Sequence, residues 1–387
     1  MQILIVGASA RAAAFSALRA GWQPICSDLF ADRDLSAACP ATRIAPGHYP
    51  EGLADFADAI DPTIPCLYTG ALENHPAVVD RIALSHPLWG NPGPVLHAVR
   101  DPIAVSAILR QTGLPHAEAR LNPIGLPIDG SWLRKPLRSA GGRGIRPFRG
   151  EPDEGGRPVY YQERLAGPSF AALYVGSNGG AQLVGLSRQW AGRPGSPFAY
   201  RGSLGGLSPR DREAGRLASL GDCLAGRFGL LGLFGVDLIR TGSGFVPVEI
   251  NPRYTASAEV IELASGVPLL LEHRRAFDPD APKSNEDRAL RGPRFAGKVI
   301  LFAPRSGRLG GRFEPRPKRS GTFDPLAVAD VPAADETFEP GDPVLTILAR
   351  GSTPRSCRSR LRRRLEAWTR AWIDGPEDRG TEIGRTS

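Results

Sequence analysis

The order of elements at the start of the chain constrains the fold most. Residues 2–6 form an apolar run that ends at Gly7, and an alanine-rich helical pattern runs from Arg11 to Ala20. A second apolar run, Pro24–Ser27, then ends in Asp28. Strand, glycine turn, helix, strand and acid together predict the opening of a doubly wound α/β domain. The turn reads Gly-Ala-Ser-Ala-Arg and lacks the glycines of a dinucleotide fingerprint, so we do not expect NAD.

Polar side chains follow these runs where ligands bind in open α/β sheets. The next apolar run, Cys66–Gly70, leads into Ala-Leu-Glu-Asn. Residues just after the carboxyl ends of parallel strands face the ligand crevice. We therefore expect five candidate substrate contacts on one rim: Ser9, Arg11, Asp28, Glu73 and Asn74. For Ser9 and Asn74 the alternative is helix capping, and for Glu73 it is a solvated acid in a first helical turn.

Composition excludes several classes of protein. The chain has 387 residues, enough for two or three domains, and no apolar run approaches the ~20 residues that span a bilayer. The 40 acidic residues are interspersed among 48 basic ones, which does not indicate a nucleic-acid surface. The N-terminus has no signal-peptide pattern, and the five cysteines form no Cys-x-x-Cys motif. We expect a cytoplasmic protein without zinc or disulfides.

Lysine and histidine are the scarce basic residues. Only four lysines occur (Lys135, Lys283, Lys298 and Lys318), so each is a candidate for a role that arginine does not fill. The six histidines are scattered, and we expect surface or capping positions for them, with His75 beside Glu73 as the exception.

The pattern of helices and strands suggests three parts. The Pro/Gly-rich segment near residue 92 marks a boundary, and a helix is predicted over 101–112. Strands and glycine loops follow from about residue 130, and a long helical period covers 209–229. Strands are predicted at 299–303 and 344–349, before a final helix. The domains are expected at 1–95, at 96–277 with a lid near 128–165, and at 278–387, which begins with a polar connector.

A lysine followed by a glycine loop is the first chemical motif. Lys135 ends a short apolar strand, and Ser-Ala-Gly-Gly-Arg-Gly follows at 139–144. A lysine supplies a point charge for phosphate, and a glycine loop folds backbone N–H groups over further phosphates. The loop is not a Walker A motif, because no Gly-Lys-Ser/Thr closes it. The second motif, Gln162–Leu165, ends an apolar strand in a polar hinge that offers backbone groups to an adenine edge.

A predicted hairpin carries the strongest signal. Asp237 and Glu249 lie in apolar strands separated by a glycine-bounded turn, and Asn251 follows two residues after Glu249. The period of two places these oxygen donors on one face. Two carboxylates there repel unless a cation lies between them, and Mg²⁺ is the cation that prefers oxygen ligands. Arg253, two positions further on, is expected on the same face to hold a phosphate or an oxyanion. The alternative is a half-exposed polar hairpin.

In this order, over about 120 residues, the motifs resemble the ATP-grasp superfamily. The resemblance covers residues 1 to about 275, and the tail resembles the biotin carboxylase branch. Within that branch the chain is similar to a group of predicted ATP-dependent carboligases, some linked to tetrahydromethanopterin or methylofuran biosynthesis. The implied fold is α/β, α+β in parts, with an N-terminal pre-ATP-grasp domain, a lid, a catalytic subdomain and a small β-rich C-terminal domain.

The resemblance implies a role for each motif residue. The residues implied to contact the phosphates are Lys135, Ser139, Gly141, Gly142, Arg143 and Gly144. Those implied to contact adenine are Gln162, Glu163, Arg164 and Leu165. The implied metal ligands are Asp237, Glu249 and Asn251, and the implied catalytic residues, which stabilise the acyl-phosphate step or contact phosphate, are Arg253 and Arg188. Two departures stand out. Arg100-Asp101-Pro102 replaces a segment with a second phosphate-binding lysine, and the ribose-binding acid after the hinge is replaced near Pro168-Ser169.

The implied activity is that of an ATP-dependent ligase with ATP and Mg²⁺, or Mn²⁺ in its place, as cofactors. It converts a carboxylate to an acyl phosphate and joins it to an amine, both small molecules, with no nucleic-acid or membrane partner. A homodimer is the family-level expectation. The alternatives are a carboxylase that activates bicarbonate, and a non-catalytic nucleotide or nucleic-acid binder. The absence of a Ser–His or Cys–His motif fits chemistry that depends on positioning and charge rather than on a protein nucleophile.

Overall fold

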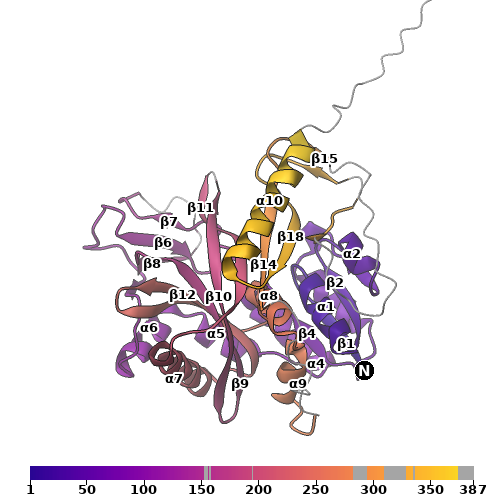
Figure 1. Cartoon of the computed structure of the whole chain (residues 1–387). Coiled ribbons are helices and arrows are strands. Elements are labelled where there is room, and N and C mark those ends of the chain that lie inside the picture. The colour runs from indigo at the N-terminus through magenta and orange to yellow at the C-terminus, as the bar shows by residue number, and fades with distance from the viewer. Residues whose placement is uncertain are drawn as a thin grey trace, which may run out of the picture.

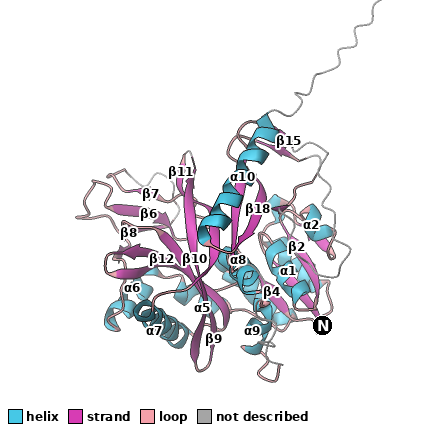
Figure 2. Cartoon of the chain, in the orientation of Figure 1, coloured by secondary structure: helices cyan, strands magenta, loops and turns pink. Residues whose placement is uncertain are grey.

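The computed structural model describes residues 1–151, 156, 158–193, 195–281, 294–308, 328–333 and 336–373. Helices and strands are both abundant in this part of the chain, and they form the expected mixed α/β architecture (Figure 2). A small parallel sheet at the N-terminus lies beside a large antiparallel sheet, and a third, smaller sheet lies at the far side of the large one (Figure 1). No described helix has the length and apolar character needed to cross a membrane.

The N-terminal sheet has the strand order β3-β2-β1-β4, and its pairs are parallel. Its strands are β1 (Gln2–Val6), β2 (Gln23–Asp28), β3 (Ala41–Arg43) and β4 (Cys66–Tyr68). Its helices are α1 (Arg11–Arg19), α2 (Arg33–Ser36), α3 (Glu51–Asp58) and α4 (Pro76–Ser85), with short 3₁₀ turns at Pro46–His48 and Leu72–Asn74. Gly7 follows β1 directly. A Cβ atom on Gly7 would lie 2.1 Å from Thr69 Oγ1, so the close approach of these two segments requires glycine.

The large sheet has eight strands in the order β13-β12-β9-β10-β11-β14-β18-β16. From the middle of the chain come β9 (Ser169–Ser177), β10 (Gly180–Arg193), β11 (Ser196–Leu207), β12 (Gly232–Thr241) and β13 (Gly244–Asn251). Alternate residues of β9 enter two different cores. Ala172 and Tyr174 pack with α7 (Asp211–Phe228), whereas Leu173 packs with α1 and with α8 (Ala256–Ser265). The face that α8 covers is therefore the face turned toward the N-terminal sheet.

The C-terminal strands continue this sheet. Strand β14 (Phe295–Phe302) pairs with β11, β18 (Pro343–Gly351) pairs with β14, and β16 (Val328–Ala329) pairs with β18. Helix α10 (Pro354–Ile373) lies over β14 and β18 (Figure 1) and buries Leu361 and Trp372, as the helical spacing predicts. A two-stranded ribbon pairs β15 (Gly307–Arg308) with β17 (Thr337–Phe338). Part of the expected connector, 282–293, lies outside the described residues.

The small third sheet has the order β5-β8-β6-β7, and β6, β7 and β8 fall within residues 128–165, the segment expected to form a lid; we refer to this sheet as the lid. Its strands are β5 (Ala119–Arg120), β6 (Trp132–Pro136), β7 (Arg146–Pro147) and β8 (Val159–Glu163). Helices α5 (Gly93–Val99) and α6 (Pro102–Gln111) precede it, and α9 (Leu269–Arg275) follows α8. The Asp101 side chain caps α6 by accepting from Ile103 N and Ala104 N, so this helix begins where the sequence predicts.

Candidate active site

A cavity of about 990 Å³ lies where the three sheets meet. Its walls come from the turn after β1, the lid strands, the β12–β13 hairpin and β14. A volume at the top of the range for single small-molecule sites gives room for more than one ligand. Most of the site residues predicted from the sequence line it: Ser9, Arg11, Lys135, Gly141, Gly142, Gln162, Glu163, Arg164, Leu165, Asp237, Glu249, Asn251 and Arg253.

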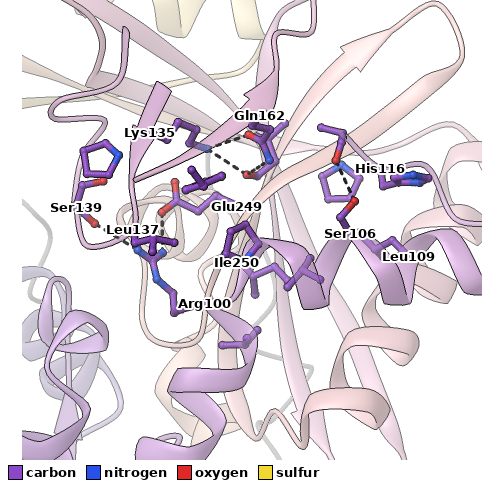
Figure 3. A pocket seen from close by; sticks show the side chains of 18 residues that line it. Arg100, Ser106, Leu109, His116, Lys135, Leu137, Ser139, Gln162, Glu249 and Ile250 are labelled. Atoms are coloured by element: carbon purple, nitrogen blue, oxygen red, sulfur yellow. Dashed lines mark hydrogen bonds and ion pairs between the residues drawn. The ribbon is translucent and has the colours of Figure 1, made fainter. Parts of the chain in front are cut away.

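Lys135 is buried between the lid and the hairpin, with 6 % of its surface exposed. Its Nζ donates to Gln162 Oε1 at 3.0 Å (Figure 3) and to Val248 O at 3.4 Å. Burial by itself lowers the pKa of Lys135, but the charges of Tyr160 and Glu249 outweigh burial and raise it. The side chain is therefore a fixed ammonium ion at the lid side of the cavity.

The Val248 carbonyl is free for these contacts because of a β-bulge. Asp237 pairs with Glu249 and Leu238 pairs with Pro247, so Val248 is the extra residue of β13. Besides Lys135, the Gln162 side chain donates to Val248 O from its Nε2 at 3.2 Å. The bulge thus joins the hairpin to the lid at the phosphate-binding lysine predicted from the sequence.

Asp237 and Glu249 are direct partners across the hairpin, as the sequence predicts. Asn251 Nδ2 donates to Asp237 Oδ2 at 3.2 Å, and Gln189 Nε2 donates to Asp237 Oδ1 at 2.9 Å. Burial, together with the charge of Glu249, raises the pKa of Asp237 to about 6. Burial also acts to raise the pKa of Glu249, but Arg100 and Lys135 outweigh it and lower that pKa.

Arg100 is a site residue that sequence reasoning noted only as a departure. It lies just before α6, and its Nη1 contacts Glu249 Oε1 at 2.8 Å (Figure 3). Its Nη2 donates to Asn74 Oδ1 at 3.2 Å, and Asn74 Nδ2 donates to Ser139 O at 3.2 Å. Arg100 therefore connects the hairpin carboxylate to the start of the glycine loop, and Ser139 lines the narrower pocket beside the large cavity.

Arg253 forms a buried ion pair with Glu73. Its Nη2 lies 2.6 Å from Glu73 Oε1 and 3.3 Å from Asn251 Oδ1. Glu73 is 2 % exposed, so the alternative of a solvated first-turn acid is wrong. Arg253 Nε and Glu73 Oε2 are buried without a hydrogen-bond partner among the described residues. The ion pair with Glu73 thus holds the Arg253 guanidinium group at the cavity wall, and its Nε–H is still available to donate a hydrogen bond.

The glycine loop lies against β11. Gly141, Gly142 and Gly144 all have φ between +63° and +77°, which favours glycine. A Cβ atom on Gly142 would come within 2.0 Å of Phe198 O, and Tyr200 N donates to Gly141 O at 3.1 Å. The loop therefore closes one side of the cavity, with Gly141 and Gly142 in the wall.

Some predicted residues do not line the cavity. Asp28 accepts from the backbone N–H groups of Ala10, Phe30 and Ala31, so it shapes the turn after β1. Arg188 pairs with Phe170 on the face of β10 and β9 that packs toward α7, opposite Gln189. The alternation of β-strand side chains thus keeps Arg188 out of the site and brings its neighbour in. Arg143 and Gly144 also lie outside the wall.

The capping alternatives do not hold for the two rim residues. Helix α1 has Ala10 at its N-cap without a side-chain cap, and Ser9 lines the cavity. Asn74 bonds Arg100 and Ser139 O rather than a helix end. Both side chains therefore belong to the surroundings of the site.

The hairpin oxygens fit a magnesium ion in donor type. The metal-ligand atoms that Asp237, Glu249 and Asn251 offer are oxygens, which Mg²⁺ prefers, and burial together with the charge of Glu249 raises the pKa of Asp237. A His- or Cys-rich centre has no counterpart here, because the described residues contain no group of three or more His, Cys, Asp or Glu side chains placed to hold a metal ion.

Part of the chain matches a known family model. Residues 108–257 match the family model of the ATP-grasp domain. The biotin carboxylase domain of 2-oxoglutarate carboxylase from Hydrogenobacter thermophilus, in complex with MgADP and bicarbonate, superposes with a TM-score of 0.71 at 14 % identity, over 96 % of this chain and 94 % of that one. No curated protein sequence matches the chain.

Two further solved structures have the same fold. N5-carboxyaminoimidazole ribonucleotide synthetase from Thermus thermophilus gives a TM-score of 0.66 at 18 % identity, over 94 % of this chain and 97 % of that one. Biotin carboxylase from Campylobacter jejuni gives 0.66 at 16 % identity, over 92 % and 89 %. At these identities the likeness concerns the fold.

Proposed function

Because the chain contains an ATP-grasp domain within the fold of the biotin carboxylases, we propose that it is an ATP-dependent ligase that joins a carboxylate to an amine. One observation carries the proposal. The lid lysine, the hairpin carboxylates and Arg253 all line a single cavity, although they come from different elements. Such a cavity has the groups needed for phosphoryl transfer to a bound carboxylate.

In this proposal the lid and hairpin bind the nucleotide. Lys135 binds the α- and β-phosphates, the loop at 139–144 covers the β- and γ-phosphates, and the hinge at 162–165 binds adenine. Asp237, Glu249 and Asn251 hold Mg²⁺, which when bound neutralises charge on the phosphates. The loop glycines have positive φ angles, a backbone conformation in which successive N–H groups can turn toward one anion.

The reaction has two displacement steps. A carboxylate oxygen of the substrate attacks the γ-phosphorus, and ADP leaves. The amine nitrogen then attacks the acyl carbon, and inorganic phosphate leaves as the amide forms. Arg253 stabilises the negative charge on the transferring group, because Glu73 holds its guanidinium in place without using every donor.

Mass spectrometry of the full chain with Mg-ATP and a metabolite extract tests the ligase. We expect ADP and a new compound whose mass equals two metabolites minus water. Lys135→Ala and Glu249→Ala should abolish both, whereas Arg81→Ala, which removes an exposed ion pair on α4, should not. Full turnover in the Glu249 variant would show that the metal assignment is wrong.

A carboxylase that activates bicarbonate is the second candidate. It is favoured by the fold match to a biotin carboxylase domain in complex with MgADP and bicarbonate. ADP release that requires bicarbonate and no amine would select it over the ligase. In that reaction a separate carrier or acceptor molecule would receive the carboxyl group.

The setting of the reaction is proposed from the resemblance alone. It is a step in the biosynthesis of a one-carbon cofactor of the tetrahydromethanopterin or methylofuran type, carried out in the cytoplasm by a homodimer. Sedimentation of the purified protein tests the dimer, and the identity of the new compound tests the pathway.

A further inference from the structure

Two thiols lie in contact in the N-terminal sheet, outside the cavity. Cys26, on β2, is fully buried, and Cys39, just before β3, is half-buried. Their Sγ atoms are 3.8 Å apart. All five cysteines lie in the described part of the chain as free thiols, and among them only this pair is in contact. The two side chains therefore form a dithiol rather than two isolated thiols.

The backbone holds the dithiol together. Cys26 N donates to Pro40 O at 2.9 Å, and Cys39 N donates to Leu35 O at 3.0 Å. The two sulfurs must come from 3.8 Å to about 2.0 Å to form a bond, which is a small movement. Cys39 is the residue that moves, because Ala37 and Pro40 on either side of it are exposed. Cys26 stays in place within a buried strand.

The two thiols differ in reactivity. Cys39 Sγ lies 3.7 Å from Leu35 O, to which it donates, so Cys26 is the donor in the contact between the sulfurs. This hydrogen bond lowers the pKa of Cys39 more than burial raises it. The same contact, together with burial, raises the pKa of Cys26. Because the thiolate is the nucleophile, Cys39 is the sulfur that reacts first, and it is also the one that solvent reaches.

We propose that Cys26 and Cys39 are an oxidative modification site, at which a hydroperoxide converts the two thiols into a reversible disulfide. With hydrogen peroxide, the Cys39 thiolate attacks one oxygen and the O–O bond breaks. The other oxygen leaves as hydroxide and becomes water with the proton that Cys39 released. The Cys26 sulfur then attacks the sulfenic sulfur of Cys39, and the sulfenic oxygen leaves as a second water with the Cys26 proton. The two thiols lose two electrons, which the peroxide gains, and an added dithiol reverses the change.

The disulfide would close a loop whose ends are 13 residues apart. This loop carries Asp28, which accepts from Ala10 N, and Asp34, which accepts from Asp330 N. Oxidation therefore acts on the segment that holds the turn after β1 and the Asp330 side of the cavity wall. The expectation of a protein without structural disulfides still applies, because disulfides in a reducing compartment are transient. The proposal does not depend on the ligase reaction.

Peptide mapping of the full chain tests the proposal. The reduced protein is treated with hydrogen peroxide, its remaining thiols are alkylated, and trypsin fragments are analysed by mass spectrometry. Arg33 lies between the two cysteines, so they fall on separate fragments. We expect these fragments to be linked after peroxide and separate after dithiothreitol, in a chain that remains single on a non-reducing gel. Fragments that stay separate while other cysteines are oxidised would overturn the proposal.

Two variants test the order of the steps. Cys26→Ala should leave the Cys39 sulfenic acid without its partner, so dimedone should label Cys39 at least tenfold faster than Cys223. Cys223 is the matched comparison, because it is also half-buried but has the Thr112 hydroxyl as its neighbour. Cys223→Ser should form the disulfide at the rate of the parent protein. Equal labelling of Cys39 and Cys223, or loss of the disulfide in Cys223→Ser, would show that the site is assigned wrongly. If Cys26→Ala does not fold, the mapping of the parent protein still decides.

Discussion

At the scale of single residues, Arg100 connects two functions of the site. It contacts the Glu249 carboxylate directly, and through Asn74 it contacts the backbone of Ser139 at the start of the glycine loop. A buried carboxylate without a cation is costly, and Arg100 is one of three cations, with Lys135 and Arg253, that keep the pKa of Glu249 low. A substitution at Arg100 should therefore affect both Glu249, which we propose as a metal ligand, and the glycine loop.

Arg100→Met should lower kcat/KM for ATP at least tenfold, which corresponds to about 1.4 kcal/mol of transition-state stabilisation. Arg100→Lys keeps the charge but not the forked contact, so it should recover only part of the loss. Steady-state ADP release measures both. Equal rates in all three proteins would show that the bridge to Asn74 and Glu249 has no role in turnover.

His273 makes stability depend on pH. It is 1 % exposed, accepts from Leu233 N at its Nδ1 and contacts Trp89 O through its Nε2, so the expectation of a surface histidine is wrong. Burial lowers the pKa of this imidazole to about 4. The unfolded chain binds the proton near pH 6.5, so stability is lost as the pH falls from about 6.5 to about 4.

The free energy of unfolding should therefore fall by about 2 kcal/mol between pH 7.5 and pH 5 through His273 alone. His273→Asn cannot be protonated in this range, so its unfolding free energy should lack that part of the pH dependence. Urea titrations at the two pH values compare the proteins. Parallel pH dependence in both would assign the effect to other groups.

At the scale of elements, the glycine loop is shaped by its contact with β11. Gly141 and Gly142 both have positive φ, but they differ in their surroundings. A Cβ atom on Gly142 meets Phe198 O at 2.0 Å, whereas nothing lies within 4 Å of a Cβ atom on Gly141. A substitution to alanine would therefore strain the backbone at either position. Only at Gly142 would the added Cβ atom also push the loop away from β11.

Gly142→Ala should raise the KM for ATP at least tenfold, because the loop must move away from β11. Gly141→Ala is the control and should cost about 1 kcal/mol of loop strain with a much smaller change in KM. Kinetics with ATP as the varied substrate measures both. Similar KM values for the two variants would mean that the loop does not contact nucleotide in this closed position.

Much of the fold and of the candidate site can be predicted from local sequence patterns. The remaining site residues depend on strand register and on contacts between segments far apart in the sequence. The β1–α1–β2 order, α7 and the pairing of Asp237 with Glu249 are set by periodicity, and the structure confirms them. The family resemblance predicts Arg188 in the site, but strand alternation places it on the face toward α7 and places Gln189 at the cavity. Lys298 and Asp330 lie far from the other motifs in sequence, and only the continuous sheet brings them to the cavity.

At the scale of the whole molecule, buried ion pairs join segments from the two ends of the chain. Arg11 of α1 contacts Glu259 of α8 and Asp330 beside β16. A second set centres on Glu262 of α8, which accepts from Arg19, from the Ser16 hydroxyl and from Leu269 N. The N-terminal sheet is thus fixed to the large sheet by charges as well as by apolar packing.

Glu262→Ala should lower the free energy of unfolding by about 3–5 kcal/mol, because it removes a buried carboxylate and leaves the half-buried Arg19 without its partner. Ser16→Ala removes one hydrogen bond and should cost only about 1 kcal/mol. Neither residue lines the cavity, so the KM for ATP should stay unchanged. Denaturant unfolding with parallel kinetics checks this, and a Glu262 variant as stable as the parent would contradict it.

The continuous eight-stranded sheet also limits how the protein can be divided. Strand β11 receives β14 along Gly202–Gly205, where the two backbones lie so close that a Cβ atom on Gly202 would meet Lys298 O at 2.3 Å. A fragment that stops after α9 would leave this row of backbone groups as an open edge. Such an edge recruits a strand from another copy, so a shortened chain is expected to aggregate rather than to behave as a minimal catalytic unit.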